Sequence, residues 1–386
     1  GILSLGVVFY AADVHGATAA QIGCLAATWS LSYVLGCALF RPLSERLLPH
    51  HSVTGAAAVM GLAVLAVLAC QHLALVYVSY VVYGLATALF WPPLMGWLST
   101  GLEGPQLNRT MGWFNLSWSC GGIVGPVIAG ALARSDARLP VAVAGSLYVI
   151  AALWAAWVVR CLPSVAVDRA VAVSAGPAAA TAAGADASTP LRYPAWVGLV
   201  AAYAAMGVVF NVFPLAAQER LGLSKVAIGV VLFVRALATS AALVALGRFT
   251  AWHFRAAPMA AGLVLFAGVL AALPQARGAV AAALLLAAVG VLLAQGYANS
   301  LFHGVAGSRR RASRMATHEA LLSVGLVCGG ACGGILFQTA GYAVVCRAAA
   351  ALLLLAAAVA AGFACTAPKA LAKGVIPPTT TDNDGN

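Results

Sequence analysis

Long apolar segments alternate with short polar clusters along almost the whole chain. The apolar segments run for about 18 to 25 residues, and Arg, His, Gly and Pro gather in the gaps between them. A helix needs about 20 such residues to cross a hydrocarbon core ~30 Å thick. The pattern therefore predicts eleven complete transmembrane helices and a partial first one.

The predicted helices follow the apolar segments closely. Residues 1–12 are apolar but carry no initiator Met, basic leader or cleavage site, so we expect the second half of a first span rather than a signal peptide. The complete spans are expected at roughly residues 17–40, 53–70, 73–98, 111–133, 140–160, 195–216, 224–247, 257–274, 279–303, 314–338 and 342–365.

Composition agrees with this pattern and excludes a soluble domain. Hydrophobic residues make up 63% of the chain, charged residues make up 8%, and the mean hydropathy is +0.96. A soluble domain of this composition would expose more apolar surface than it could keep from water. We expect an all-α protein embedded in a lipid bilayer.

Basic residues are distributed unevenly between the gaps. Fourteen Lys and Arg residues fall in one set of alternate gaps and in the tail, and six fall in the other set. Because cytoplasmic loops keep positive charge, the first set and both termini are expected in the cytoplasm. The expected location is the plasma membrane, in a bacterium the inner membrane. The net charge of +11 follows from this topology and requires no nucleic-acid partner.

One stretch near the middle differs in composition from its surroundings. Between Pro163 and Pro190 the sequence is rich in Ala, Ser, Gly and Pro, which is typical of a mobile linker. The expected organisation is a transmembrane half over residues 1–162, a disordered cytoplasmic linker over 163–192, a second transmembrane half over 193–366 and a disordered cytoplasmic tail over 367–386.

Glycine-containing motifs recur in the two halves with matching order. An offset of 204 residues relates Ser119 to Ser323, Gly121 to Gly325, Gly125 to Gly329 and Gly130 to Gly334, and an offset of 206 relates Thr18 to Ser224 and Gly23 to Gly229. Chance is the alternative, since the chain has 40 Gly residues. Agreement at two separate places favours two similar six-helix halves, related by a pseudo-twofold axis along the membrane normal.

Two motifs resemble those of a known family. Pro42 to His51 reads P-L-S-E-R-L-L-P-H-H, which resembles the loop G-x-L-A-D-R-x-G-R-R between helices two and three of the major facilitator superfamily. On that match Glu45 stands at the acidic position and Arg46 follows it. Gly121 to Gly130 reads G-G-I-V-G-P-V-I-A-G and resembles the signature G-x-x-x-G-P-x-x-G-G, which is frequent in the family's exporters.

In layout the resemblance covers essentially the whole chain. It implies a twelve-helix bundle, here with eleven full spans and a partial first, that transports solutes by alternating access. It also implies that helices one, four, seven and ten line a central cavity, and that helices five and eleven lie at the boundary between the halves.

Arg235 is the one charged residue deep within an expected span. It follows Lys225 by ten residues, which is ~15 Å along a helix and near the centre of a bilayer. A cation there is costly unless it faces water or a partner, so Arg235 is a candidate for the substrate cavity. No acid is expected beside it, which favours an anionic substrate. The alternative is a structural hydrogen bond to a backbone carbonyl, a Tyr or an Asn.

Residues four or eight apart form stripes on the fourth, seventh and tenth expected spans. We expect these stripes to line the central cavity that the resemblance implies. For each Asn or Gln, hydrogen bonding at a dry interface between helices is the alternative. The stripes consist of Thr87, Trp91 and Met95, of Tyr203 and Asn211, and of Gln295, Asn299 and His303.

Small residues on the fifth and eleventh spans are candidates for gating, because they let helices approach closely and slide. Glu45 could join them if it sits near the N-terminus of the eleventh span, where the helix dipole attracts an anion. A solvated loop charge is the alternative for Glu45. The gating set is Gly121, Gly125, Pro126, Gly325 and Gly329, with Glu45 and Arg46.

The energy source is left open by the sequence. Proton-driven carriers often use a buried acid, whereas Asp13, Glu219 and Glu319 all lie close to the ends of expected spans. His303 is a second candidate for coupling to protons, since an unperturbed His titrates at about pH 6.5. No His or Cys set at zinc spacing is present, so no metal and no other cofactor is expected.

The leading hypothesis is a monomeric secondary carrier that moves a small organic molecule outward. An uptake carrier or uniporter for a neutral polar solute such as a sugar is the alternative in the same class. A receptor or scaffold that keeps the fold without transport is the alternative in another class. An enzyme is not expected, because His318 and Glu319 lack the second His of H-E-x-x-H and no G-x-S-x-G occurs.

Overall fold

A computed structural model describes residues 1–40, 43, 47–99, 104–161, 188–306 and 311–366. Within these ranges the chain forms α-helices, two short 3-10 helices and the turns between them. Glu45 and Arg46, the linker over residues 163–187 and the tail over 367–386 lie outside the described residues. What was expected of them stays a prediction.

The N-terminal half is built from long helices that run back and forth across the bundle. In chain order they are α1 (Ile2–His15), α2 (Ala19–Leu39), α4 (Pro49–Ala66, continued by the 3-10 helix η1, Val67–Ala69), α5 (Leu73–Ser99), α6 (Gly104–Ser135) and α7 (Leu139–Cys161).

The C-terminal half repeats this arrangement with one extra break. Its helices are α9 (Arg192–Asn211), α10 (Phe213–Leu221), α11 (Lys225–Leu246), α12 (Ala256–Ala272, continued by η2, Leu273–Gln275), α13 (Gly278–Val305), α14 (Arg311–Ala340) and α15 (Tyr342–Thr366).

Ten of the eleven complete spans expected are confirmed. Among the described residues, ten helices are long and apolar enough to cross a membrane, and α1 is a shorter apolar helix of 14 residues. The fifth expected span lies within α6, which has 32 residues and is not one of these ten. The seventh expected span, 195–216, is divided at Val212 into α9 and α10, because Pro214 has no backbone N–H and its ring restricts the preceding residues.

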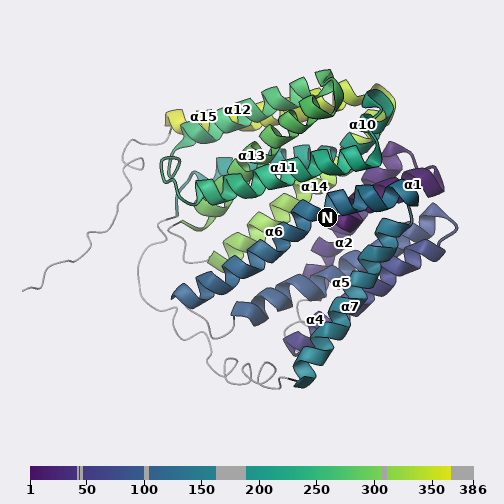
Figure 1. Ribbon diagram of the computed structural model, residues 1–386. Helices are drawn as coiled ribbons and strands as arrows, with labels where there is room; N and C mark the ends of the chain where they lie inside the picture. The colour runs from purple at the N-terminus through teal and green to yellow at the C-terminus, as the bar shows by residue number, and fades with distance from the viewer. Residues whose placement is uncertain (41–42, 44–46, 100–103, 162–187, 307–310, 367–386) are drawn as a thin grey trace, which may run out of the picture.

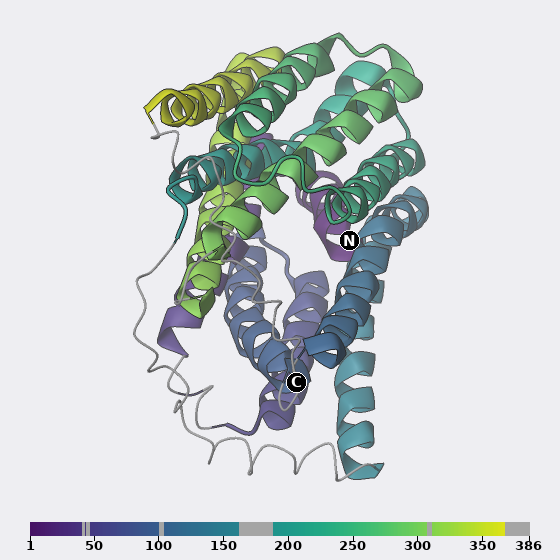
Figure 2. The same cartoon turned by 90° about the vertical axis from the view of Figure 1, so that its left-hand side faces the viewer.

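The helices form two bundles, one from each half of the chain (Figures 1 and 2). One hydrophobic cluster draws nearly all of its buried residues from α1 to α7, and a second draws most of its residues from α9 to α15. Leu5, Phe9, Ala129 and Ala133 of the first half join the second cluster. Each half therefore has its own core, and α1 and α6 of the first half also pack against the core of the second.

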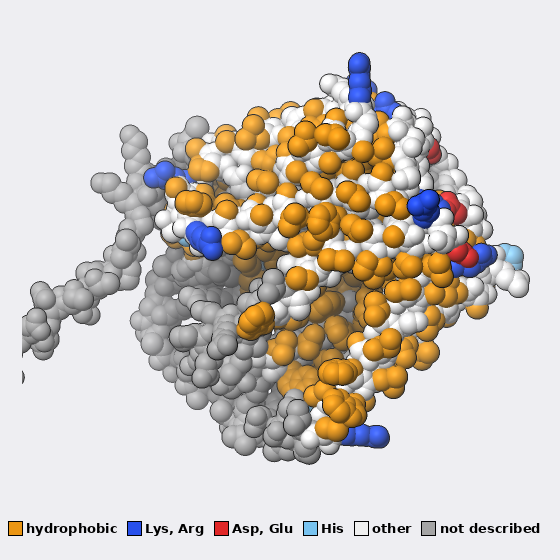
Figure 3. Space-filling model, viewed as in Figure 1, with side chains coloured by type: hydrophobic (Ala, Val, Ile, Leu, Met, Phe, Trp, Pro, Cys, Tyr) orange, Lys and Arg blue, Asp and Glu red, His pale blue; other side chains and the backbone are white. Residues whose placement is uncertain are grey.

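The surface agrees with burial in lipid. Large apolar side chains cover much of the face shown in Figure 3, and most of the Lys and Arg side chains seen there lie toward the ends of the helices. Leu62, Leu153 and Leu355, for example, are each more than 60% exposed. An integral membrane protein explains this surface, since lipid removes the cost of exposing it.

The repeat predicted from glycine spacing appears as matching helix starts. Thr18 precedes α2 and accepts a hydrogen bond at Oγ1 from the backbone N–H of Gln21, at 3.3 Å. Ser224 precedes α11 and accepts the equivalent bond at Oγ from Ala227, at 3.2 Å. Both residues are N-caps that satisfy a free backbone donor, so the two repeated positions have the same structural role.

Four glycines bring the two halves into backbone contact at symmetric places. At Gly130 a Cβ would overlap the carbonyl oxygen of Lys225, and at Gly334 it would overlap that of Ala19. The same holds for Gly229 against Pro126 and for Gly23 against Gly330. The junction of α6 with α11 therefore repeats the junction of α14 with α2. Only glycine lets helix backbones approach this closely.

Candidate functional site

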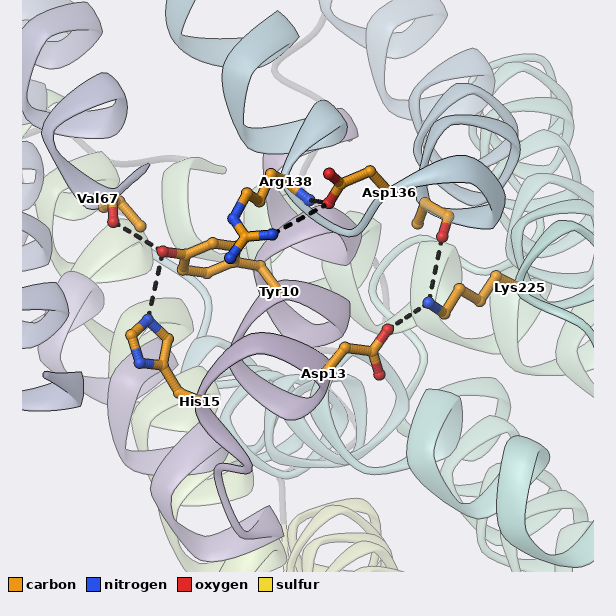
Figure 4. A network of polar contacts seen from close by, with 8 residues as sticks. Tyr10, Asp13, His15, Val67, Asp136, Arg138 and Lys225 are labelled. Carbon is orange, nitrogen blue, oxygen red and sulfur yellow. Dashed lines mark hydrogen bonds and ion pairs between the residues drawn. The ribbon is translucent and has the colours of Figure 1, made fainter. Parts of the chain in front are cut away.

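The two halves are joined by a lysine at one end of the bundle, hereafter the Lys225 end. The Lys225 ammonium of α11 forms an ion pair with Asp13 of α1 and donates a hydrogen bond to the carbonyl oxygen of Ala133 of α6, at 3.1 Å (Figure 4). Its nitrogen also lies 5.6 Å from the centre of the Phe9 ring. All three partners belong to the N-terminal half, so Lys225 ties α11 to both α1 and α6.

Further polar contacts secure the N-terminal half at the same end. The Tyr10 hydroxyl donates to the carbonyl oxygen of Val67 at 2.8 Å and lies 3.3 Å from His15 Nε2 (Figure 4). Arg138 pairs with Asp136 at 3.9 Å. These contacts stay within one half, which distinguishes them from the bridge that Lys225 makes.

The halves separate toward the opposite end. In Figure 1, α6 and α11 lie close together near the start of α11 and diverge along their length. Consistent with this, a Cβ at Gly121 or Gly122 of α6 would meet nothing within 4 Å. Trp113 and Trp118, nearer the start of α6, are each 63% exposed. The structure is therefore closed at the Lys225 end and open between α6 and α11 at the other.

Arg235 lies inside the C-terminal half, with its side chain directed toward α9. It is 6% exposed, its Nη1 donates to the sulfur of Met206 at 3.7 Å, and the guanidinium lies 5.0 Å from the centre of the Phe210 ring. Its Nε has no hydrogen-bond partner, and no acidic side chain among the described residues pairs with it. Among the described residues Arg235 is therefore a buried cation without an acidic partner, and its place in a substrate cavity stays a prediction.

The two candidates on α9 face different neighbours. The Tyr203 ring lies 6.5 Å from that of Tyr297 on α13. Asn211 is buried, donates from Nδ2 to the carbonyl oxygen of Gly207 at 2.8 Å, and lies against Gly330. Tyr203 therefore faces α13, whereas Asn211 packs at the junction with α14.

The amides of the stripe on α13 pack against α12 in this structure, and their contact with substrate stays a prediction. The Gln295 Nε2 donates to the carbonyl oxygen of Pro258 at 2.8 Å. Gln295 and Asn299 line a void of about 10 Å³ enclosed by α9, α12 and α13, which is close to the smallest volume that holds one water. The Asn299 Oδ1 has no hydrogen-bond partner there. These amides face packing within one half, as the dry-interface alternative describes.

His303 likewise contacts a loop in this structure. Its ring is fully buried, its Nε2 accepts a hydrogen bond from the Phe254 backbone N–H at 3.2 Å, and its Nδ1 lies 2.9 Å from the Asn299 carbonyl oxygen. Phe254 has a φ of 54°, a region that bulky residues rarely adopt, so this hydrogen bond helps to hold the turn between α11 and α12. The place of His303 in a substrate cavity stays a prediction.

On α5 the expected stripe is divided. Thr87 is buried and donates to the carbonyl oxygen of Tyr83 on its own helix, at 2.7 Å. Trp91 is partly exposed and packs edge-on against Phe114 of α6, with ring centres 5.8 Å apart. Met95 is also partly exposed. Trp91 links α5 to α6 within the N-terminal half, and its contact with substrate stays a prediction.

Helices five and eleven do lie at the boundary, but most of the predicted gating glycines face their own half. Gly325 and Gly329 of α14 pack against the backbone of α9, and Gly125 packs against the start of α1. Of the predicted set, Pro126 touches the other half, at Gly229. Spacing showed which residues share a face, and packing decided which neighbour that face meets. A role in gating stays a prediction for all of them.

Glu319 is a candidate that the sequence interpretation set aside as too close to a span end. The helix α14 starts at Arg311 and its apolar span starts at Thr317, so Glu319 lies near the start of that span, as the sequence indicated. Its side chain is exposed, and α14 packs against α2 of the first half and α9 of the second. The sequence feature that could have drawn attention to Glu319 is that it is a lone acid within an apolar helix.

Comparisons with known proteins agree with this architecture. The sequence model of the Major Facilitator Superfamily matches residues 1–183. A search of curated proteins finds no match.

Two solved structures illustrate the similarity in fold. The structure of a bacterial homologue of the human lysosomal transporter Spinster, inward-facing and unoccupied, has a TM-score of 0.68 and 12% identity, over 94% of this chain and 95% of that one. A variant of the nucleoside transporter NupG has a TM-score of 0.64 and 12% identity, over the same shares. At this identity the likeness shows the fold alone. Residues 1–183 are thus similar in sequence to the Major Facilitator Superfamily, and the whole chain has the fold of these two transporters.

Proposed function

We propose that this chain is a secondary transporter that moves a small organic molecule across the membrane by alternating access. The observation that carries the proposal is the uneven junction between the halves, which meet at the Lys225 end and diverge toward the other. Two halves with separate cores can rock about such a junction and expose the space between them to either side in turn.

Arg235 supports an anionic group on the substrate. It is a buried guanidinium without an acidic partner among the described residues, and aromatic Phe210 covers one of its faces. A charge in this position is costly, and a ligand of opposite charge would offset that cost when it binds. A carboxylate or phosphate suits a guanidinium because it can accept two parallel hydrogen bonds.

Export from the cytoplasm is the direction we propose, with the Lys225 end facing outward. The loops expected on the other side carry the excess of Lys and Arg, which favours the cytoplasm for that side in the bacterial inner membrane. The likeness of Gly121 to Gly130 to a signature of exporters supports the direction. On this orientation the structure is open toward the cytoplasm, where an exported solute would enter.

Flux measurements in proteoliposomes test the proposal. Anionic, neutral and cationic solutes would be compared, with and without a pH gradient, for the wild type and for Arg235→Ala. Arg347→Ala is the matched control, because Arg347 is exposed on α15 and donates to the carbonyl oxygen of Ala343 on its own helix. We expect anions to move fastest, Arg235→Ala to lower their flux at least tenfold, and Arg347→Ala to resemble the wild type.

Other outcomes point to the alternatives. Unchanged anion flux in Arg235→Ala would remove the argument for an anionic group. Fastest movement of a neutral solute, equal in both directions, would favour a uniporter. If no solute moves and none changes the distance between the halves at the Lys225 end, a receptor or scaffold becomes the better description.

A further inference from the structure

A cavity of about 530 Å³ lies at the Lys225 end, within the C-terminal half of the protein. Its walls come from α10, from the end of α12 with η2, and from the first residues of α13 and α15. Neither Arg235 nor any other residue predicted to contact substrate lines it. The volume is in the range of sites that hold small organic molecules, so the cavity is a candidate for a second binding site.

The lining of this cavity is apolar inside and charged at the mouth. Phe213 and Leu273 are buried, with 1% and 2% of their surface exposed, whereas Arg220, Gln275 and Arg277 are exposed. A ligand that fits this lining has an apolar body and a polar head.

The two arginines have no acidic partner in the part of the chain that the structure describes. Arg220 lies on α10 and Arg277 directly precedes α13, and no acidic side chain lines the cavity. Glu219 is adjacent to Arg220 in sequence but forms no ion pair with either arginine. The Arg220 guanidinium lies 5.8 Å from the centre of the Tyr342 ring. Both cations are therefore available to an anion.

The positive charge of the cavity comes from these side chains rather than from the helix ends around it. Two helices, α13 and α15, begin at the cavity, and two others, α10 and α12, end there. The positive ends of the first pair oppose the negative ends of the second, so their dipoles largely cancel. The two guanidiniums remain, and they favour an anionic ligand.

Tyr342 adds a buried hydroxyl to the lining. The residue is 7% exposed, and its hydroxyl has no oxygen or nitrogen partner, only a weak contact with the Cys346 thiol on the same helix. A buried hydroxyl without a good acceptor is unfavourable. An oxygen atom of an anionic ligand would supply that acceptor.

The cavity lies at the level where the apolar spans end. The spans of α12, α13 and α15 have their limits at Gln275, Gly278 and Tyr342, and residues at or beside all three limits line the cavity. Lipid headgroups and water meet at this level of a bilayer. Both a lipid and a solute therefore have access to the two arginines.

We infer that this cavity binds an amphipathic phosphate, with the phosphate group held by Arg220 and Arg277 and the apolar body against Phe213 and Leu273. Phosphate suits two guanidiniums because its oxygens accept several charge-assisted hydrogen bonds. A lipid headgroup and a soluble organic phosphate share this chemistry. The inference does not depend on the proposed function, since every lining residue belongs to one half and none has a part in the transport argument.

Three probes separate the charge from the apolar body. They are naphthyl phosphate, naphthol, which lacks the phosphate, and inorganic phosphate, which lacks the rings. Binding of each to the protein in phosphatidylcholine nanodiscs would be measured by isothermal titration calorimetry.

Four variants separate this cavity from other sources of binding. The double variant Arg220→Gln with Arg277→Gln removes both charges. Ala276→Phe keeps the charges and fills part of the cavity, because Ala276 lines it. Arg235→Ala tests the proposed substrate site. The matched control is Arg134→Gln, since Arg134 is an exposed arginine of α6 at the same end and does not line the cavity.

We expect the wild type to bind naphthyl phosphate at least about tenfold more tightly than naphthol or inorganic phosphate. The double variant and Ala276→Phe should each weaken this binding at least about tenfold, while Arg134→Gln and Arg235→Ala stay within about twofold of the wild type. Thermal unfolding of each variant without ligand would show that it is folded.

Lipid composition distinguishes the two sources of the phosphate. Unfolding temperatures would be compared in nanodiscs of phosphatidylcholine and of phosphatidylglycerol, whose headgroup is anionic. If a lipid fills the cavity, phosphatidylglycerol should stabilise the wild type and Arg134→Gln more than the double variant. Equal stabilisation of all three, with naphthyl phosphate still bound as expected, would assign the cavity to a soluble phosphate.

Two results would overturn the inference. One is equal binding of naphthyl phosphate by the wild type and the double variant. The other is a wild type that binds naphthyl phosphate no more tightly than naphthol or inorganic phosphate. Neither result affects the proposed function, which is tested separately by flux.

Discussion

Lys225, the first residue of α11, pairs with Asp13 at the end of α1, 212 positions earlier in the chain. The two residues belong to different halves, and Lys225 also donates to the carbonyl oxygen of Ala133 of α6. The ion pair is partly exposed, with 22% and 37% of the two side chains accessible. It therefore stabilises the closed Lys225 end without locking it, because a partly solvated pair contributes little.

Asp13→Asn is expected to shift the population toward conformations that open at the Lys225 end. Loss of a partly exposed ion pair costs up to about 1 kcal/mol, or roughly a fivefold change in the ratio of states. Distances between spin labels on Ser135 and Glu219, exposed residues of the two halves at this end, would report the shift. The reversed pair, Asp13→Lys with Lys225→Asp, should restore the closed population.

Asp136→Asn is the control for this prediction, because Asp136 pairs with Arg138 inside one half. An equal shift in Asp136→Asn would mean that local charge, rather than the bridge between halves, sets the population.

Gly130→Ala and Gly334→Ala are expected to disturb the two junctions to similar extents. The added Cβ would overlap the carbonyl oxygen of Lys225 in one case and of Ala19 in the other, so the backbones must move apart. Overpacking of this kind typically costs about 1–3 kcal/mol. Thermal unfolding and the same label distances would measure it.

Gly268→Ala serves as the comparison, since a Cβ at Gly268 would meet nothing within 4 Å and alanine favours a helix. If Gly130→Ala were as well tolerated as Gly268→Ala, the backbone contact between α6 and α11 would not be a constraint.

His303→Ala is expected to reduce stability rather than substrate affinity. The change leaves the Phe254 N–H without its acceptor and opens a space beneath Trp252 and Phe302, at a cost of about 1–3 kcal/mol. Thermal unfolding should fall accordingly, with the KM for transport unchanged in the folded fraction. A raised KM with normal stability would return His303 to the substrate cavity.

The turn between α11 and α12 is expected to loosen in acid. His253 stacks on Phe302 with ring centres 3.8 Å apart, and burial lowers the pKa of His253 below its ordinary value. A base whose pKa is lowered by folding contributes stability above its unfolded pKa of about 6.5, and that contribution is lost as the pH falls below this value. Hydrogen exchange of residues 247–255 should therefore quicken at pH 5.

His253→Gln removes the titrating group while keeping a polar side chain, so exchange in this variant should depend less on pH. An unchanged pH dependence would assign the effect to another group.

Hydropathy and spacing predicted much of the fold. Lipid requires about 20 apolar residues in each helix, so the ends of most spans were evident from composition. The repeated glycines predicted the duplication because close contact between helices leaves few other residues possible. Arg235 was predicted to lie inside the helix bundle because a charge exposed to lipid in the middle of a span would be costly.

Tertiary structure decided which neighbour each helix face meets. A period of 3.6 residues puts Gln295, Asn299 and His303 on one side of α13, but only packing shows that this side faces α12 and a loop. The ion pair of Asp13 with Lys225 and the backbone contact of Gly130 with Lys225 join residues far apart in sequence. Local patterns carry no information about such contacts, because the rotation and tilt of each helix depend on all of its neighbours at once.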